Sequence, residues 1–194
     1  MDIMENPSSC TEKIRSAVHG AQHPGPPDPA LYQPTSVMGL FILNGAPSLL
    51  FIQKADVPGY PWRNQMAFPG GHQDKGDSNR LETALRELNE EVGILRENVE
   101  VLGSIGHYQT INHRDIQAFV GIWNQTDTID FDPGEISRTL EVPLDHLIRL
   151  HRDRGYAGTT PDIMELTYPF EDVVIWGVTA KIIHHLLEIL PTDP

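Results

Sequence analysis

The sequence of 194 residues predicts one α/β domain, with an α+β arrangement as the alternative. Three observations support this prediction. Short apolar runs of strand length recur along the chain, some segments carry apolar residues at helical spacings of three and four, and no internal repeat is visible. Hydrophobic residues make up 39% and charged residues 21%, which is typical of globular proteins and not of disordered or fibrous ones.

The N-terminal segment, residues 1–34, is predicted to be an arm that precedes the main domain at residues 35–194. Its stretch SSCTEKIRSAV is typical of a short helix, with Ile14 and Val18 on one face. The following HPGPPDPALYQP carries five prolines and is incompatible with regular structure. We expect the arm to pack onto the domain or onto a partner, and a homodimer would provide such a partner.

The first half of the domain predicts strands. Residues 36–43 (SVMGLFIL) and 48–54 (SLLFIQK) are apolar runs separated by NGAP, and Asn-Gly between such runs is a strong hairpin signal. Residues 99–110 (VEVLGSIGHYQT) and 115–123 (DIQAFVGIW) are rich in branched and aromatic side chains, so each predicts a strand, with a loop at INHR between them.

The C-terminal part predicts two helices. Residues 138–152 (RTLEVPLDHLIRLHR) predict a strand that ends before Pro143 and a short helix after it. Residues 164–170 (MELTYPF) predict another strand, and residues 173–190 (VVIWGVTAKIIHHLLEIL) predict a C-terminal helix. The inward face of that helix is expected to consist of Trp176, Ala180, Ile183, Leu187 and Leu190.

A helix at residues 81–92 (LETALRELNEEV), ended by Gly93, carries a cluster of acids. Glu87 and Glu91 are four residues apart and point the same way, with Glu90 beside them. Three crowded carboxylates repel one another, so a bound cation explains them more economically than a solvated acidic face does. Oxygen ligands of this kind suit Mg²⁺ or Mn²⁺.

A glycine pair stands before this helix, in AFPGG. Gly70 and Gly71 permit a sharp turn and a close approach of backbone carbonyls to a ligand. The side chain of Arg86 lies beside the acids and can orient one of them. The turn and the helix together therefore predict a metal site to which a loop carbonyl contributes.

These residues resemble a family motif, the Nudix box, written G-x5-E-x7-R-E-U-x-E-E-x-G-U with U apolar. RELNEEVGI matches its second half residue for residue. In the first half, Ser78 stands eight residues before Arg86, where the pattern has Glu, and Gly71 comes one residue too early. We expect one extra residue in the loop, with the missing Glu replaced by an acid among Asp74, Asp77 and Glu82.

The likeness extends to one branch of the family. QMAFPGGHQDKGDSNRLETALRE resembles the branch that includes coenzyme A pyrophosphatases, in which AFPGG, an Asp six residues past the second Gly, and TALRE recur together. IWGVTAK near the C-terminus recurs there too, so the likeness covers roughly residues 36–190. The stretch KADVPGYPWRNQ, in contrast, lacks the Arg and His pattern associated with coenzyme A enzymes.

The resemblance implies a Nudix fold, an α/β/α sandwich around a mixed sheet. It implies hydrolysis of a nucleoside diphosphate linked to another moiety, coenzyme A or a derivative being one candidate, by attack of water at phosphorus with Mg²⁺ or Mn²⁺. By motif position, Glu87 and Glu91 are metal ligands, and Glu90 is a further ligand or a water-shell carboxylate. The Gly71 carbonyl is a backbone ligand, and Arg86 positions Glu90.

Two roles remain open in this resemblance. The proton of the attacking water goes either to a box acid such as Glu90 or to an acid of a later loop, for which Glu135 in DPGEIS is the candidate. Substrate phosphates require cationic donors. The candidates are Arg63, Lys54 and Arg114.

Two further functions are weighed against this one: a house-cleaning pyrophosphatase for damaged nucleoside triphosphates, and a Nudix module that binds a nucleotide without cleaving it. A net charge of −13 disfavours nucleic acid as a partner and leaves a small nucleotide bound through metal. The sequence shows no secretory signal or membrane span, so we expect a cytoplasmic protein.

His107, His113, His146 and His151 show no metal-ligand spacing along the chain. His184 and His185 are consecutive, so they face different sides of the predicted helix and do not form a pair. His151 is likewise interpreted as an ordinary residue.

Overall fold

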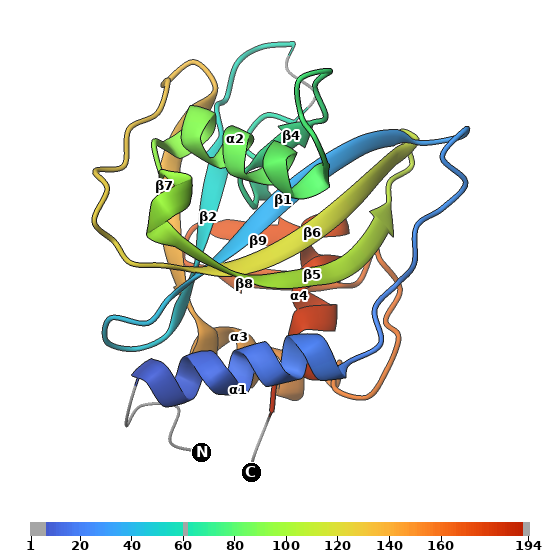
Figure 1. Ribbon diagram of the computed structural model, residues 1–194. Coiled ribbons are helices and arrows are strands. Elements are labelled where there is room, and N and C mark those ends of the chain that lie inside the picture. Colours follow the sequence, from blue (N-terminus) through green and yellow to red (C-terminus); the bar gives the residue numbers. More distant parts are fainter. Residues whose placement is uncertain (1–6, 60–61, 192–194) are drawn as a thin grey trace.

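The computed structural model describes residues 7–59 and 62–191. Its elements surround one central sheet (Figure 1). The helices are α1 Pro7–Gly20, α2 Arg80–Val92, the 3-10 helix η1 Arg96–Asn98, α3 Leu144–Asp153 and α4 Gly177–Ile189. The strands are β1 Gln33–Ile42, β2 Ser48–Lys54, β3 Met66–Ala67, β4 Gly70–His72, β5 Val99–Gln109, β6 Arg114–Trp123, β7 Ile136–Pro143, β8 Thr167–Phe170 and β9 Val173–Trp176.

Within the described residues the main sheet has seven strands, with the order β3-β2-β1-β6-β5, while β4 pairs with β1 and β7 with β2. Strands β1 and β6 run parallel, and the other pairs are antiparallel, so the sheet is mixed as expected. The hairpin predicted at Asn-Gly is confirmed by the antiparallel pairing of Leu40 with Leu50.

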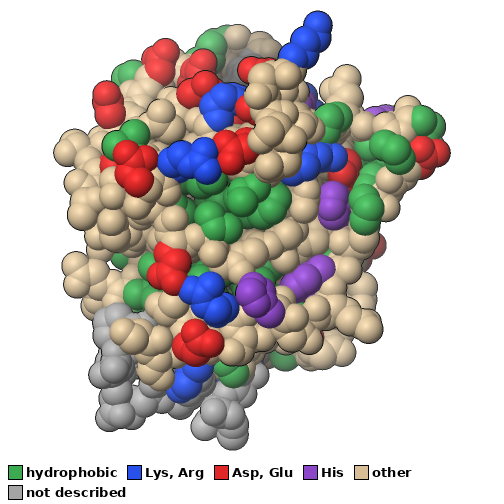
Figure 2. Space-filling model, in the orientation of Figure 1, with side chains coloured by type: hydrophobic (Ala, Val, Ile, Leu, Met, Phe, Trp, Pro, Cys, Tyr) green, Lys and Arg blue, Asp and Glu red, His purple; other side chains and the backbone are tan. Residues whose placement is uncertain are grey.

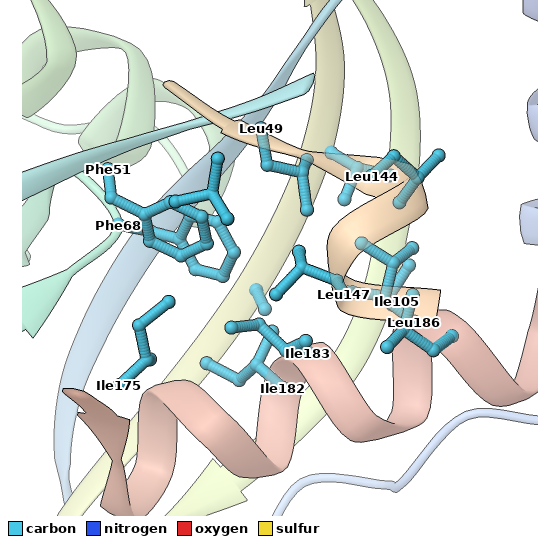
Figure 3. Packing of buried hydrophobic residues seen from close by; sticks show 14 of the residues in the cluster. Leu49, Phe51, Phe68, Ile105, Leu144, Leu147, Ile175, Ile182, Ile183 and Leu186 are labelled. Atoms are coloured by element: carbon cyan, nitrogen blue, oxygen red, sulfur yellow. The ribbon is translucent and has the colours of Figure 1, made fainter. Parts of the chain in front are cut away.

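Side chains of β1 alternate between two cores, which is why helices cover both faces of the sheet. Met38 and Leu40 pack in the core beneath α2 with Leu88. Phe41 belongs to the opposite core, with Ile183 of α4. Figure 3 shows that second core, where side chains of β2 meet those of α3 and α4. The predicted α/β/α arrangement is confirmed, with α2 on one face and α1, α3 and α4 on the other (Figure 1).

Helix α2 has a defined start and end. The side chain of Asn79 accepts a hydrogen bond from the Glu82 amide at 3.0 Å, which caps the first turn. Gly93 adopts a left-handed conformation with φ of 74°, and its N–H donates to the Asn89 carbonyl. The helix predicted from apolar spacing is therefore confirmed, and its acids occupy fixed positions along it.

The C-terminal helix is shorter than predicted. Residues 173–176 form β9, because Val173 and Ile175 are buried while Val174 and Trp176 point outward, the alternation of a strand. Gly177, with φ of 66°, then allows the chain to turn into α4. The expectation that Trp176 packs inward is wrong, since it is 52% exposed, whereas the other inward residues are buried as expected.

The N-terminal arm lies against its own chain. In α1, Cys10, Ile14 and Val18 are buried in the core of that face. The proline-rich segment contacts β5, because the His107 amide donates a hydrogen bond to the Pro24 carbonyl at 2.9 Å. Residues 1–6 of the arm lie outside the described residues, and a homodimer stays a prediction. No helix in the described part of the chain is long and apolar enough to cross a bilayer.

Candidate active site

The glycine pair begins the short strand β4, which contacts α2. Gly70 and Gly71 pair with Val37 and Ser36 of β1. A Cβ at Gly70, where φ is 156°, would lie 2.2 Å from the Ser36 carbonyl oxygen, and a Cβ at Gly71 would lie 2.3 Å from the carboxylate carbon of Glu87. The first glycine lets the backbone approach β1, and the second makes room for an acid of the helix.

Arg86 holds the acids of the site in place. Its Nε and Nη2 donate to the two carboxylate oxygens of Asp77 at 3.0 Å each. Its Nη1 donates to Glu90 at 2.7 Å and to Glu87 at 3.0 Å. The side chain of Asp77 is 7% exposed, and hydrogen bonding to Arg86 keeps its pKa far below the usual range. Asp74, by contrast, is 72% exposed and 4.0 Å from the guanidinium.

This arrangement resolves which acid replaces the missing Glu of the box. Asp77 is the sixth residue after Gly71 and binds Arg86 with both oxygens, so the extra residue lies between Asp77 and the helix acids, not before Asp77. Glu82 is not the partner of Arg86. It binds Arg96 instead, at 2.8 and 3.0 Å. Asp77 is also the Asp six residues past the second Gly in the branch resemblance, and the structure selects it from the three candidates.

Glu91 is the most buried acid of the cluster, 9% exposed. The Gly70 amide donates to one of its oxygens at 2.8 Å, and the ammonium group of Lys54 pairs with the other. Burial raises the pKa of Glu87, and the neighbouring acids Glu91 and Glu90 act in the same direction, against Arg86. Cations of the protein thus hold carboxylates that would otherwise repel one another.

The donor set fits a hard divalent cation. The carboxylates of Glu87, Glu90 and Glu91 and the backbone of the glycine turn supply oxygen atoms only, the ligands that Mg²⁺ and Mn²⁺ prefer. Because Gly71 has no Cβ, the Glu87 carboxylate lies close to the loop backbone. Lys54 and Arg86 now compensate the negative charge that a divalent cation would compensate.

A pocket of about 140 Å³ adjoins Glu91, because Lys54 and Gly70, both bonded to that residue, also line it. Another wall carries Arg114, whose guanidinium carbon lies 5.7 Å from the centre of the Trp62 ring. The apolar walls are formed by Phe68, Val178 and Ile182, among others. This pocket combines two cationic side chains with an apolar surface.

Two of the expected residues lie apart from this pocket. Arg63 is 61% exposed and faces Asp56 at 3.8 Å, and it is absent from the pocket walls. The Glu135 side chain is also exposed, but its carbonyl accepts a hydrogen bond from the Ala55 amide at 2.8 Å, which places its backbone beside the end of β2 that carries Lys54. Arg63 is therefore not brought to the site, and Glu135 lies at its margin.

A larger hollow, about 390 Å³, is lined by residues of α2, of the loop before it and of the segment that leads into η1. It is lined by Asp77, Arg86 and Arg96, and Glu87, Glu90 and Glu91 line neither this hollow nor the smaller pocket. Figure 2 shows acidic and basic side chains interleaved over the upper part of this face, where α2 lies. We place the site at the smaller pocket because Gly70 of the glycine turn and Lys54, the two partners of the buried Glu91, line it, together with the apolar wall.

A glycine turn, an arginine-anchored loop acid and three glutamates on a helix against a mixed sheet define a hydrolase site of the Nudix type. The family model described as NUDIX domain matches residues 33–162, and the chain belongs to the Nudix family. Nudix hydrolases act on phosphorus-containing anhydrides in small nucleotide-linked compounds and generally need divalent metal ions.

Named relatives agree with this assignment. The chain is 32% identical over 154 residues to an uncharacterized Nudix hydrolase NudL of Pectobacterium atrosepticum, covering 78% of this chain and 79% of the relative. It is 33% identical over 128 residues to the protein of the same name from Photorhabdus laumondii, covering 64% and 67%.

Solved structures share the fold. A MutT/nudix family protein from Enterococcus faecalis superposes with a TM-score of 0.54 at 16% identity, over 94% of this chain and 73% of that one. A binary complex of an Ap4A hydrolase from C. elegans gives 0.50 at 18% identity, over 63% and 89%.

Proposed function

We propose that this chain is a Mg²⁺- or Mn²⁺-dependent pyrophosphohydrolase that cleaves a nucleoside diphosphate linked to another moiety, with coenzyme A or a derivative as the first substrate to test. The observation that carries the proposal is that two cations hold the three helix acids: Arg86 binds Glu87 and Glu90, and Lys54, which lines the pocket together with Arg114, binds Glu91. The branch-level resemblance in sequence supports coenzyme A as that first candidate.

The metal would be held by the carboxylates of Glu87, Glu90 and Glu91 and by the Gly71 carbonyl. When bound, it supplies neutralisation of charge on the phosphate oxygens and a water of lowered pKa. Arg86 would fix the two acids that it contacts, Glu87 and Glu90, while its own position is fixed by the carboxylate of Asp77.

The substrate would be oriented by groups of the pocket. Lys54 points a cation at the boundary between Glu91 and the pocket, where the phosphates of a bound nucleotide would lie. Arg114 offers a second cation, held over Trp62. The apolar wall that includes Phe68 suits an organic moiety beyond the phosphates.

The group that receives the proton of water is Glu90 or Glu135. Glu90 is held by Arg86 at 2.7 Å, while Glu135 has its side chain in solvent beside β2. Glu90→Gln and Glu135→Gln separate the two, since only the loss of the base should lower kcat and also remove the acidic limb of the pH–rate profile. If both variants keep the profile of the parent, neither acid is the base.

Glu91→Gln tests the proposal as a whole. The amide oxygen of Gln can still accept from Gly70, so the fold should persist, but one anionic ligand is lost. We expect turnover to fall by about 100-fold or more, while Glu97→Gln, an exposed acid of η1, should act like the parent. Unchanged metal-dependent turnover in Glu91→Gln would refute the proposal.

The substrate is identified with a panel of coenzyme A, dinucleoside polyphosphates, sugar nucleotides and modified nucleoside triphosphates, each with and without EDTA. A preference for coenzyme A supports the proposed substrate, and a preference for modified triphosphates favours the house-cleaning function. Tight nucleotide binding with no phosphate release across the panel would identify a binding module instead.

A further inference from the structure

Helices α3 and α4 bring together three metal-binding side chains on the face of the sheet opposite α2. His151 lies in the last turn of α3, and His184 and Glu188 lie one turn apart on α4. One potential ligand atom of each residue lies within 4.8 Å of the others. This is the only such group of three or more His, Cys, Asp or Glu residues within the part of the chain that the structure describes.

We propose that His151, His184 and Glu188 form a second metal site, one for Zn²⁺, separate from the carboxylates of α2. Two imidazoles and one carboxylate are a donor set that Zn²⁺ takes with a fourth position left to water. It differs in kind from the oxygen-only set of α2, which suits harder cations.

Binding a metal ion requires small movements of the three side chains. A tetrahedral Zn²⁺ with bonds of roughly 2.1 Å places neighbouring ligand atoms roughly 3.4 Å apart. His151 Nε2 lies 2.8 Å from a Glu188 oxygen, so this pair must open slightly, and a ligand atom of His184 lies within 4.8 Å of both residues. Rotation of side chains on two packed helices suffices for movements of this size, because the three residues already share one side of the α3–α4 contact.

Neighbouring groups set the imidazole nitrogens. The Tyr156 carbonyl can only accept, so Nε2 of His184, 3.3 Å away, carries its proton and Nδ1 keeps a lone pair. His151 Nδ1 lies 2.9 Å from the hydroxyl of Tyr168, which can accept as well as donate. The Glu188 oxygen beside His151 Nε2 can only accept, so Nε2 carries a proton while it makes that contact. When His151 instead carries its proton on Nδ1 and donates it to Tyr168, the Nε2 lone pair becomes available to a metal.

The site is open enough for an ion to enter. A pocket of about 180 Å³ reaches His151 and Glu188, and the Glu188 side chain is 29% exposed although His151 is only 5% exposed. The Gly158 amide donates to both oxygens of Glu188, at 3.1 and 3.0 Å, which orients that carboxylate. Glu188 supplies the only negative charge among the three ligands. The exposed Arg152 also lines the pocket, and its positive charge opposes a bound cation.

Isothermal titration of the EDTA-treated full chain with Zn²⁺ tests the proposal, using the Glu87→Gln/Glu91→Gln variant as parent to remove two acids of α2. We expect one Zn²⁺ per chain and at least about tenfold weaker binding in His184→Gln and in Glu188→Gln. In Glu188→Gln the side-chain oxygen can still accept a hydrogen bond from the Gly158 amide, so the fold should persist. His146→Gln in α3, at a histidine outside the cluster, is the matched control and should bind as the parent does.

Co²⁺ spectra supply a second measurement. A four-coordinate site with imidazole ligands gives intense visible bands, whereas six oxygen ligands give weak ones, so the parent should show the intense bands and His184→Gln should lose them. The proposal is overturned if the parent binds no Zn²⁺, if His184→Gln and Glu188→Gln bind like the parent, or if the Co²⁺ bands are weak.

Discussion

Replacing Gly71 by Ala tests whether the glycine turn exists to admit the Glu87 carboxylate. The backbone of Gly71 is not in the left-handed region, so it can accommodate Ala. The added Cβ, however, would lie 2.3 Å from the carboxylate carbon of Glu87 and 2.4 Å from each oxygen, where ordinary contacts begin at 3.4 Å. Glu87 must therefore retreat by about 1 Å.

That displacement sets the expected size of the effect. Misplacing a catalytic group by about 1 Å costs on the order of 100-fold in rate, or about 2.7 kcal/mol of transition-state stabilisation. The clash falls on the end of a flexible side chain, so the free energy of unfolding should change by less than about 1 kcal/mol. Gly71→Ala should thus lose kcat/KM about 100-fold and weaken Mg²⁺ activation, while its thermal melting stays close to that of the parent.

The assay is steady-state hydrolysis of the best substrate of the panel at a series of Mg²⁺ concentrations, together with a thermal melt. Gly76→Ala is the matched control, because that glycine lies in the same loop and an added Cβ there meets nothing within 4 Å. It should keep kcat/KM within about twofold. If Gly71→Ala retains activity within about threefold of the parent, the inferred role of Gly71 is wrong.

The remaining predictions concern stability around the same turn, measured by urea denaturation. Gly70→Ala should cost at least about 2 kcal/mol, because the added Cβ meets a β1 carbonyl at 2.2 Å and φ is 156°; a loss below about 0.5 kcal/mol would contradict the close approach. Asp77→Asn should cost about 2–3 kcal/mol at pH 7, less than a fully buried pair because Arg86 is 25% exposed, whereas Asp74→Asn should be nearly neutral. Folding lowers the pKa of Asp77, so the ion pair contributes fully to the free energy of unfolding at pH values above the ordinary pKa of 3.8. The difference in free energy of unfolding between the parent and Asp77→Asn should therefore narrow as the pH falls below 3.8, and a constant difference would refute the ion-pair account.

The fold was predictable where local chemistry decides it. The apolar spacing of α2, with Gly93 to end it, and the Asn-Gly hairpin each depend on a few neighbouring residues, and both were predicted correctly. The mistake at residues 173–176 has a physical cause: four apolar residues fit a helix and a strand equally well, and pairing with β8 decides between them. That pairing is a tertiary contact, which local spacing does not contain.

The candidate site divides in the same way. Glu87, Glu90 and Glu91 were predicted to lie together because helical geometry alone brings them together. The pairing of Lys54 with Glu91 joins residues 37 positions apart and depends on how α2 packs on the sheet, so spacing gives no hint of it.

The histidine cluster shows where spacing helps and where it fails. Consecutive positions correctly exclude a pair of His184 with His185, and the chain instead places His185 against His23 of the arm, 3.0 Å apart. The spacing of four between His184 and Glu188 is that of two ligands on one helical face, a signal present in the sequence. The third member, His151, comes from another helix, and only the packing of α3 against α4 brings it within reach. Two of the three proposed ligands, one turn apart on α4, can therefore be found from the sequence, whereas the third requires the tertiary structure.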